Sequence, residues 1–193
     1  MMQGLQAMKD SAALLVYWDG EASDISWPEP CIVEYVTNGQ GRINSMSKEA
    51  VNAMIADQDM SVHDLISIGN IRKKYPPQTS TEKTVMQTVI GDMMSVYPSE
   101  SYGIIFGSHG SGWLPTITGT RSIGQDGGRY SSDTALIPEL AEVLRTVNPQ
   151  KFDFVLFDAC MMGCAEVYYE LKDAAKYLSL IHISEPTRRT PIS

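Results

Sequence analysis

A histidine and a cysteine each follow a run of apolar residues that is typical of a buried strand. The histidine, His109, ends the stretch YGIIFGSH at residues 102–109, and the cysteine, Cys160, ends FDFVLFDAC at residues 152–160. In open parallel sheets, ligands collect outside the carboxyl ends of the strands. If the two strands are neighbours, both residues lie at one edge of the sheet, roughly 5 Å apart. The sequence therefore predicts a thiol–imidazole pair.

Such a pair can perform acyl transfer. A free thiol is only slightly ionised at neutral pH, and an imidazole beside it can accept its proton or stabilise the thiolate. The thiolate of Cys160 can then attack an acyl carbon, and the protonated His109 can donate a proton to the leaving amine. The resulting oxyanion needs hydrogen-bond donors, for which the backbone N–H groups of Gly110 and Cys160 are candidates. Asp158 either supports the pair by orienting it or binds N–H groups of the turn.

Other chemistries fit these residues less well. No G-x-S-x-G motif surrounds Ser108 or Ser111, so a serine nucleophile is disfavoured. The candidate zinc ligands are His109, Cys160 and Cys164, which are one ligand short of a structural zinc site. Cys160 and Cys164 are four residues apart, which on a helix would place them on one face, and Cys164 is expected to be a small buried residue. The positive end of the helix that follows Cys160 can help the thiolate. His63 is expected at the surface or half-buried.

The remaining sequence supplies alternating strands and helices. Val85, Val89 and Ile90 belong to one apolar stripe of a helix that Pro98 ends. Further strands are expected at residues 13–18 and 31–36, further helices from Ser47, from Asp133 and over residues 164–178, and a polar loop at residues 116–133. This alternation predicts an α/β sandwich with a mostly parallel sheet.

Charge and composition restrict the partners. The 193-residue chain has a formal net charge of -8 and a pI of about 4.8. This balance argues against nucleic acid or an anionic membrane surface and suits a cationic substrate. No apolar run approaches the roughly 18 residues of a membrane span, and no signal peptide is visible at the start. Three cysteines form no disulfide framework.

The last sixteen residues differ in character from the rest. Residues 178–193 have no amphipathic period and end in a polar Pro/Thr/Arg cluster. The stretch LSLIHISEPTR resembles the translation of a sequencing adapter that has been read as coding sequence. We therefore expect a natural domain over residues 1–177 and a non-native tail over residues 178–193, which leaves only His63 and His109 as candidate functional histidines.

The segments SHGSGW, FDACMM and EVYYELKDAAKYL closely resemble clostripain-like cysteine peptidases, the C11 family of the caspase-like clan, over residues 80–177. Cys160 follows His109 by 51 residues, and caspases place their histidine about 50 residues before an x-A-C motif. The resemblance implies a caspase-like α/β/α sandwich, here truncated at the C-terminus. It also implies His109 as general base, Cys160 as nucleophile, and cleavage after arginine or lysine.

Further expectations come from the same resemblance. Family members often cut themselves between histidine and cysteine, where this chain offers Arg129 and Arg121. Some members need calcium, although no calcium loop is evident, and members are frequently exported, although the start leaves the compartment unknown. The strands that help build the pocket for the basic side chain would lie beyond residue 177. The alternative is therefore an inactive fragment or a pseudo-peptidase that binds without cleaving.

Overall fold

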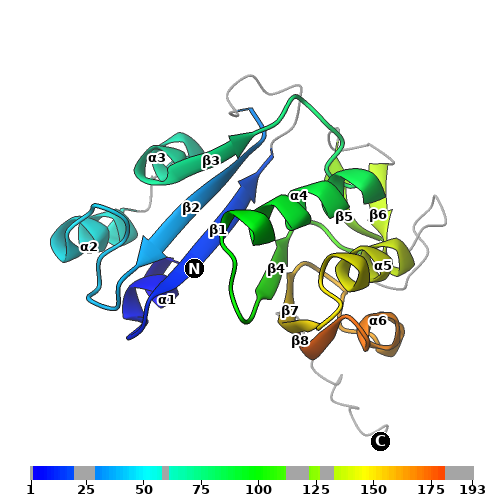
Figure 1. Cartoon of the computed structure of the whole chain (residues 1–193). Helices are drawn as coiled ribbons and strands as arrows, with labels where there is room; N and C mark the ends of the chain where they lie inside the picture. Colours follow the sequence, from blue (N-terminus) through cyan, green and yellow to red (C-terminus); the bar gives the residue numbers. More distant parts are fainter. Residues whose placement is uncertain (1, 20–28, 58–60, 112–121, 127–132, 181–193) are drawn as a thin grey trace, which may run out of the picture. The chain divides into compact units, whose positions relative to one another are not determined.

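A computed structural model describes residues 2–19, 29–57, 61–111, 122–126 and 133–180 (Figure 1). The chain divides into two compact units. The first contains Met1–Gln78 and Met93–Tyr97, and the second contains Thr79–Asp92 and Pro98–Ser193.

The first unit is built on a three-stranded antiparallel sheet. Its strand order is β1-β2-β3, and β1 and β2 confirm the two strands expected near the start of the sequence. Ser47 caps α2 as predicted, because its hydroxyl accepts a hydrogen bond from the N–H of Ala50 at 3.2 Å. The elements are α1 (Met2–Ala7), β1 (Ala12–Trp18), β2 (Cys31–Thr37), α2 (Lys48–Ala56), α3 (Val62–Ile68) and β3 (Asn70–Lys74).

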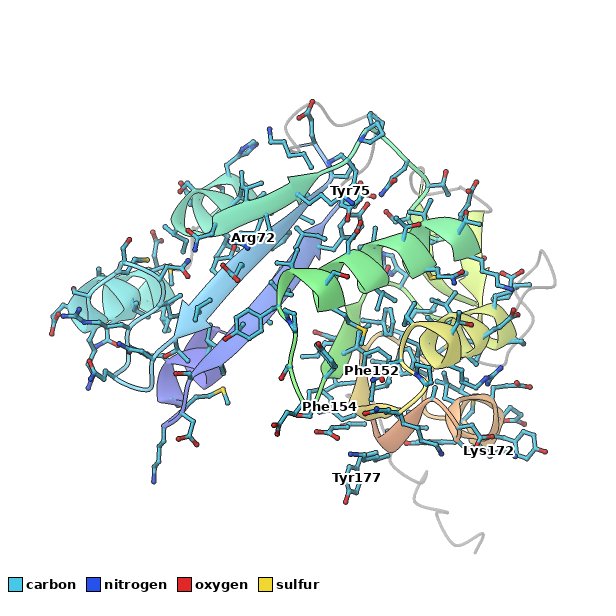
Figure 2. The ribbon with its side chains drawn as sticks, viewed as in Figure 1. Arg72, Tyr75, Phe152, Phe154, Lys172 and Tyr177 are labelled. Atoms are coloured by element: carbon cyan, nitrogen blue, oxygen red, sulfur yellow. The ribbon has the colours of Figure 1, made fainter. Side chains whose placement is uncertain are left out.

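The edge strand β3 carries a bulge at Arg72. Ile32 pairs with Lys73 and Val33 pairs with Ile71, so Arg72 is the extra residue between the two pairs. Arg72 is labelled in Figure 2. Its guanidinium lies 3.7 Å from the carboxylate of Glu34, whose side chain is 9% exposed. The bulge thus directs a cation toward the buried acid of the neighbouring strand.

The second unit contains a parallel sheet with the order β4-β7-β8. Phe106 of β4 stacks on Phe157 of β7 with ring centroids 5.6 Å apart, and the helices supply buried apolar residues such as Ile90 and Leu140. The elements are α4 (Lys83–Val96), whose residues from Met93 onward are assigned to the first unit, β4 (Gly103–Gly107), β5 (Ser122–Asp126), β6 (Asp133–Leu136), α5 (Ile137–Val147), β7 (Phe152–Asp158), α6 (Ala165–Leu171) and β8 (Ala175–Leu180). A mixed α/β fold with a parallel sheet is therefore confirmed.

Several element boundaries differ from the prediction. Helix α5 begins at Ile137 rather than Asp133, because Pro138 occupies the first turn, where a missing N–H costs nothing. Residues 122–126, expected in a loop, and residues 133–136, expected at the start of that helix, form the antiparallel pair β5 and β6. The helix predicted over residues 164–178 ends at Leu171, and strand β8 follows it. This strand includes three residues that the sequence analysis assigned to the tail.

Strand β8 pairs with β7 along its whole length, and one ion pair also joins the two strands. The two strands run parallel from the pair Phe152–Ala175 to the pair Phe157–Leu180. The Lys176 ammonium donates to the carboxylate of Asp153 at 2.6 Å. Across the described part of the chain, no helix has the length and apolar character needed to cross a membrane.

Candidate active site

The register of β4 and β7 brings the two predicted strand exits together. The strands pair in parallel, and the last pair is Gly107 with Asp158. The N–H of Ser108 then donates to the carbonyl of Asp158 at 3.3 Å. His109 and Cys160 each lie two residues beyond the last pair, so both leave the sheet at the same edge and level. The predicted placement of the two strand exits side by side is confirmed.

The reactive side chains face solvent, while their neighbours anchor the backbone. His109, Asp158 and Cys160 are all exposed. Between and after them, Ala159 is 5% exposed and Met162 is 1% exposed. Burial of these two side chains holds the cysteine-bearing segment in place and leaves the thiol accessible, as a nucleophile requires.

The hydrogen-bond ladder between β4 and β7 stops just before the predicted oxyanion donors. If the parallel pattern continued, Cys160 N–H would donate to Ser108 and Gly110 N–H would donate to Cys160. Neither bond forms, and within the described residues neither N–H has another acceptor. Both groups are therefore available to an incoming oxygen, which the proposed oxyanion role requires.

Gly110 packs directly against the cysteine-bearing segment. A Cβ atom at position 110 would lie 2.6 Å from the carbonyl oxygen of Cys160 and 3.0 Å from the sulfur of Met162. The sequence analysis did not foresee this contact, because it depends on how closely the two backbones approach. Glycine here is required by the fold of the site.

Strand β5 supports the histidine-bearing segment from its other side. Gly124 N–H donates to the carbonyl of His109 at 2.9 Å, and Gly110 forms an isolated antiparallel bridge with Ile123, which is 4% exposed. In this type of bridge the N–H of Gly110 is directed away from Ile123. The histidine is thus fixed between β7 and β5.

The chain after Cys160 turns twice before a helix begins. The backbone of Met161 has a φ of 59°, in the left-handed region that residues other than glycine rarely adopt. Cys164 N–H donates to the carbonyl of Met162 at 3.0 Å, and α6 begins only at Ala165. Cys160 therefore lies outside α6 and shares no helix face with Cys164. The help expected from the positive end of the following helix is not supported, because the turns separate Cys160 from the start of α6.

The other sequence candidates lie in different surroundings. Cys164 is half-buried rather than buried, and its side chain makes no capping hydrogen bond to α6. His63 is exposed on α3, as expected. Arg121 and Arg129, the proposed self-cleavage positions, lie outside the described residues. Desolvation raises the pKa of Cys31, a thiol buried in the core of the first unit.

Asp158 and a possible metal ion are the remaining features suggested for the site. The Asp158 carboxylate makes neither a hydrogen bond nor an ion pair with any described residue, so its supporting role stays a prediction. No cluster of three or more His, Cys, Asp or Glu side chains that could hold a metal ion occurs among the residues described. No residue is therefore assigned to calcium.

A mixed α/β fold with a parallel sheet matches solved cysteine proteases of the caspase-like class. The clostripain family model, Peptidase_C11, matches residues 1–191, and the chain belongs to this family. No curated protein sequence matches.

Solved structures of C11 proteases are similar to this chain. One is a secreted C11 cysteine protease from Bacteroides thetaiotaomicron in complex with an irreversible peptide inhibitor (30% identity, TM-score 0.62, 90% of this chain and 40% of that one). Another is an inactive zymogen C11 protease from Parabacteroides distasonis (26% identity, TM-score 0.56, 91% and 42%). The fold also matches "iotapain", a secreted C11 cysteine protease from Bacteroides thetaiotaomicron (19% identity, TM-score 0.58, 86% and 40%). The chain spans about two fifths of the length of these proteins.

Proposed function

We propose that this chain carries the catalytic pair of a cysteine endopeptidase that cleaves after arginine or lysine. The observation that supports the proposal best is the register of β4 and β7, which places the exits bearing His109 and Cys160 at one edge of the sheet. Both side chains are exposed there. Membership of the clostripain family supports the same reaction class.

The proposed reaction begins with proton transfer from the Cys160 thiol to the His109 imidazole. The sulfur attacks the carbonyl carbon of the scissile bond, and the carbonyl oxygen gains negative charge. The N–H groups of Gly110 and Cys160 donate to that oxygen. His109 then gives the proton to the leaving amine, and water hydrolyses the acyl-enzyme with His109 as base.

The net charge of -8 supports the preference for basic side chains, because it favours cationic substrates. The peptide inhibitor bound to the similar Bacteroides protein supports a peptide substrate. We propose export for the parent protein, because that similar protein is secreted. Cleavage after Arg129 or Arg121 is our proposal for maturation.

A second candidate is a module of the same fold that binds without cleaving. Two observations favour it. The chain spans about two fifths of its structural relatives, and one of those relatives is an inactive zymogen. In this candidate the site retains its thiol, but no formed pocket selects a basic side chain.

Labelling with a peptidyl-arginine chloromethyl ketone separates the two candidates. We expect one adduct at Cys160 in a version of the protein extended to the length of its relatives, and none in Cys160→Ala. The matched control reagent has norleucine in place of arginine, which keeps the chain length and removes the charge. Equal labelling by both reagents would refute the basic preference, and absence of labelling by either would refute the peptidase.

A further inference from the structure

Two of the three cysteines lie on one short surface loop next to the proposed nucleophile. Cys160 is exposed and Cys164 is half-buried, and both are free thiols. Cys31 differs from both, because it is 1% exposed in the core of the first unit. An oxidant in solution therefore reaches the thiols of the 160–164 loop in preference to Cys31.

The backbone of this loop turns back on itself between the two cysteines. Met161 takes the left-handed conformation with a φ of 59°. The hydrogen bond from Cys164 N–H to the carbonyl of Met162, at 3.0 Å, closes a three-residue turn around Gly163. A disulfide needs Cα atoms about 4.4–6.8 Å apart, and tight turns are what bring residues of so short a loop to such a separation.

The middle of the loop is anchored while its ends stay accessible. Met162 is 1% exposed, and its side chain packs against Gly110. Cys164 occupies the position before α6, yet its side chain makes no capping hydrogen bond. Its thiol is thus not committed to capping the helix.

We propose that Cys164 is a resolving cysteine that protects Cys160 from irreversible oxidation by forming a disulfide with it. The disulfide would regulate activity only if the proposed function holds, because it then masks the nucleophile Cys160. The Cys160 sulfur attacks a peroxide oxygen: the S–O bond forms, the O–O bond breaks, and hydroxide leaves as water. The Cys164 sulfur then attacks the sulfenic sulfur: the S–S bond forms, the S–O bond breaks, and the hydroxide takes the thiol proton. Thiol–disulfide exchange with a dithiol restores both thiols.

Differential alkylation tests this proposal without any need for activity. The 193-residue chain is treated with a small excess of hydrogen peroxide, then denatured and alkylated with N-ethylmaleimide before or after dithiothreitol. Residues 152–172 contain both cysteines and no internal lysine or arginine, so trypsin releases them in one peptide. We expect Cys160 and Cys164 to lose alkylation together and to regain it together after reduction, while Cys31 remains alkylated throughout.

Variants decide between resolution and independent oxidation. In Cys164→Ser and Cys164→Ala, we expect Cys160 to form a dimedone-reactive sulfenic acid and to recover about fivefold less thiol after reduction than the wild type. Cys31→Ser, the matched control, should behave as the wild type. Equal recovery in the Cys164 variants, or loss of alkylation at Cys160 alone in the wild type, would overturn the proposal.

The outcome is independent of the labelling test above. If the disulfide forms but the ketone does not label Cys160, the resolving role of Cys164 stands and the peptidase proposal is refuted. Ketone labelling without a disulfide refutes only this inference.

Discussion

Replacement of Gly110 by alanine tests how tightly the two strand exits are packed. The new Cβ would lie 2.6 Å from the carbonyl oxygen of Cys160 and 3.0 Å from the sulfur of Met162. Because the nearest atom belongs to the backbone, no side-chain rotation relieves the contact. The segment that carries Cys160 must therefore move.

The cost follows from the packing. Overpacking a tight contact typically destabilises a protein by about 1–3 kcal/mol. For a chain of this size, about 2–4 °C of Tm corresponds to each kcal/mol, so we expect a decrease of roughly 2–12 °C. Displacement of reacting groups by an ångström costs about 100-fold in rate, and we expect ketone labelling of Cys160 to slow by a comparable factor.

Gly107 provides the matched control on the same strand exit. A Cβ atom at position 107 would meet nothing within 4 Å. Thermal unfolding and the rate of labelling are measured for Gly110→Ala, Gly107→Ala and the wild type. If both variants unfold and react alike, the close approach of Gly110 to Cys160 is not a feature of the folded protein.

Two further predictions concern strand edges. Arg72→Ala leaves Glu34 buried without its cation, and since Arg72 is 44% exposed we expect the free energy of unfolding by urea to fall by roughly 1–2 kcal/mol. The control Lys74→Ala breaks an exposed pair and should cost less than about 1 kcal/mol. Equal losses in the two variants would contradict the role of the bulge. The hydrogen bond from Lys176 lowers the pKa of Asp153, so its contribution to stability is present above the usual aspartate pKa of about 3.9 and is lost as the pH falls through the lower folded value. Asp153→Asn should therefore remove part of the decrease in the urea midpoint below pH 4, and an unchanged pH dependence would show that the pair does not hold β8.

The parts of the fold that position the site could be predicted because their signals are local. An unbroken apolar run with a glycine-rich exit marks β4, and a similar run before Asp158 marks β7. The apolar stripe of α4 likewise identifies its buried face. Strand adjacency was inferred from the general behaviour of parallel sheets, and the register of Gly107 with Asp158 confirmed it.

The parts that could not be predicted depend on tertiary contacts. Residues 175–178 fit the end of an amphipathic helix, but pairing with β7 outweighs their helical propensity and makes them β8. The left-handed turn at Met161 has no sequence signature, because a methionine gives no indication of positive φ. The close approach at Gly110 could have been suspected only from the glycine itself.

The most direct test of the central claim is the rate at which iodoacetamide alkylates Cys160 at pH 7, in the wild type and in His109→Ala. This small neutral reagent needs no substrate pocket, so the chain can be used as it stands. If His109 accepts the thiol proton, the rate should fall by roughly 10- to 30-fold in His109→Ala, because an ordinary thiol is only about 3% ionised at pH 7, and His63→Ala should react as the wild type does. An unchanged rate in His109→Ala would contradict the thiol–imidazole pair.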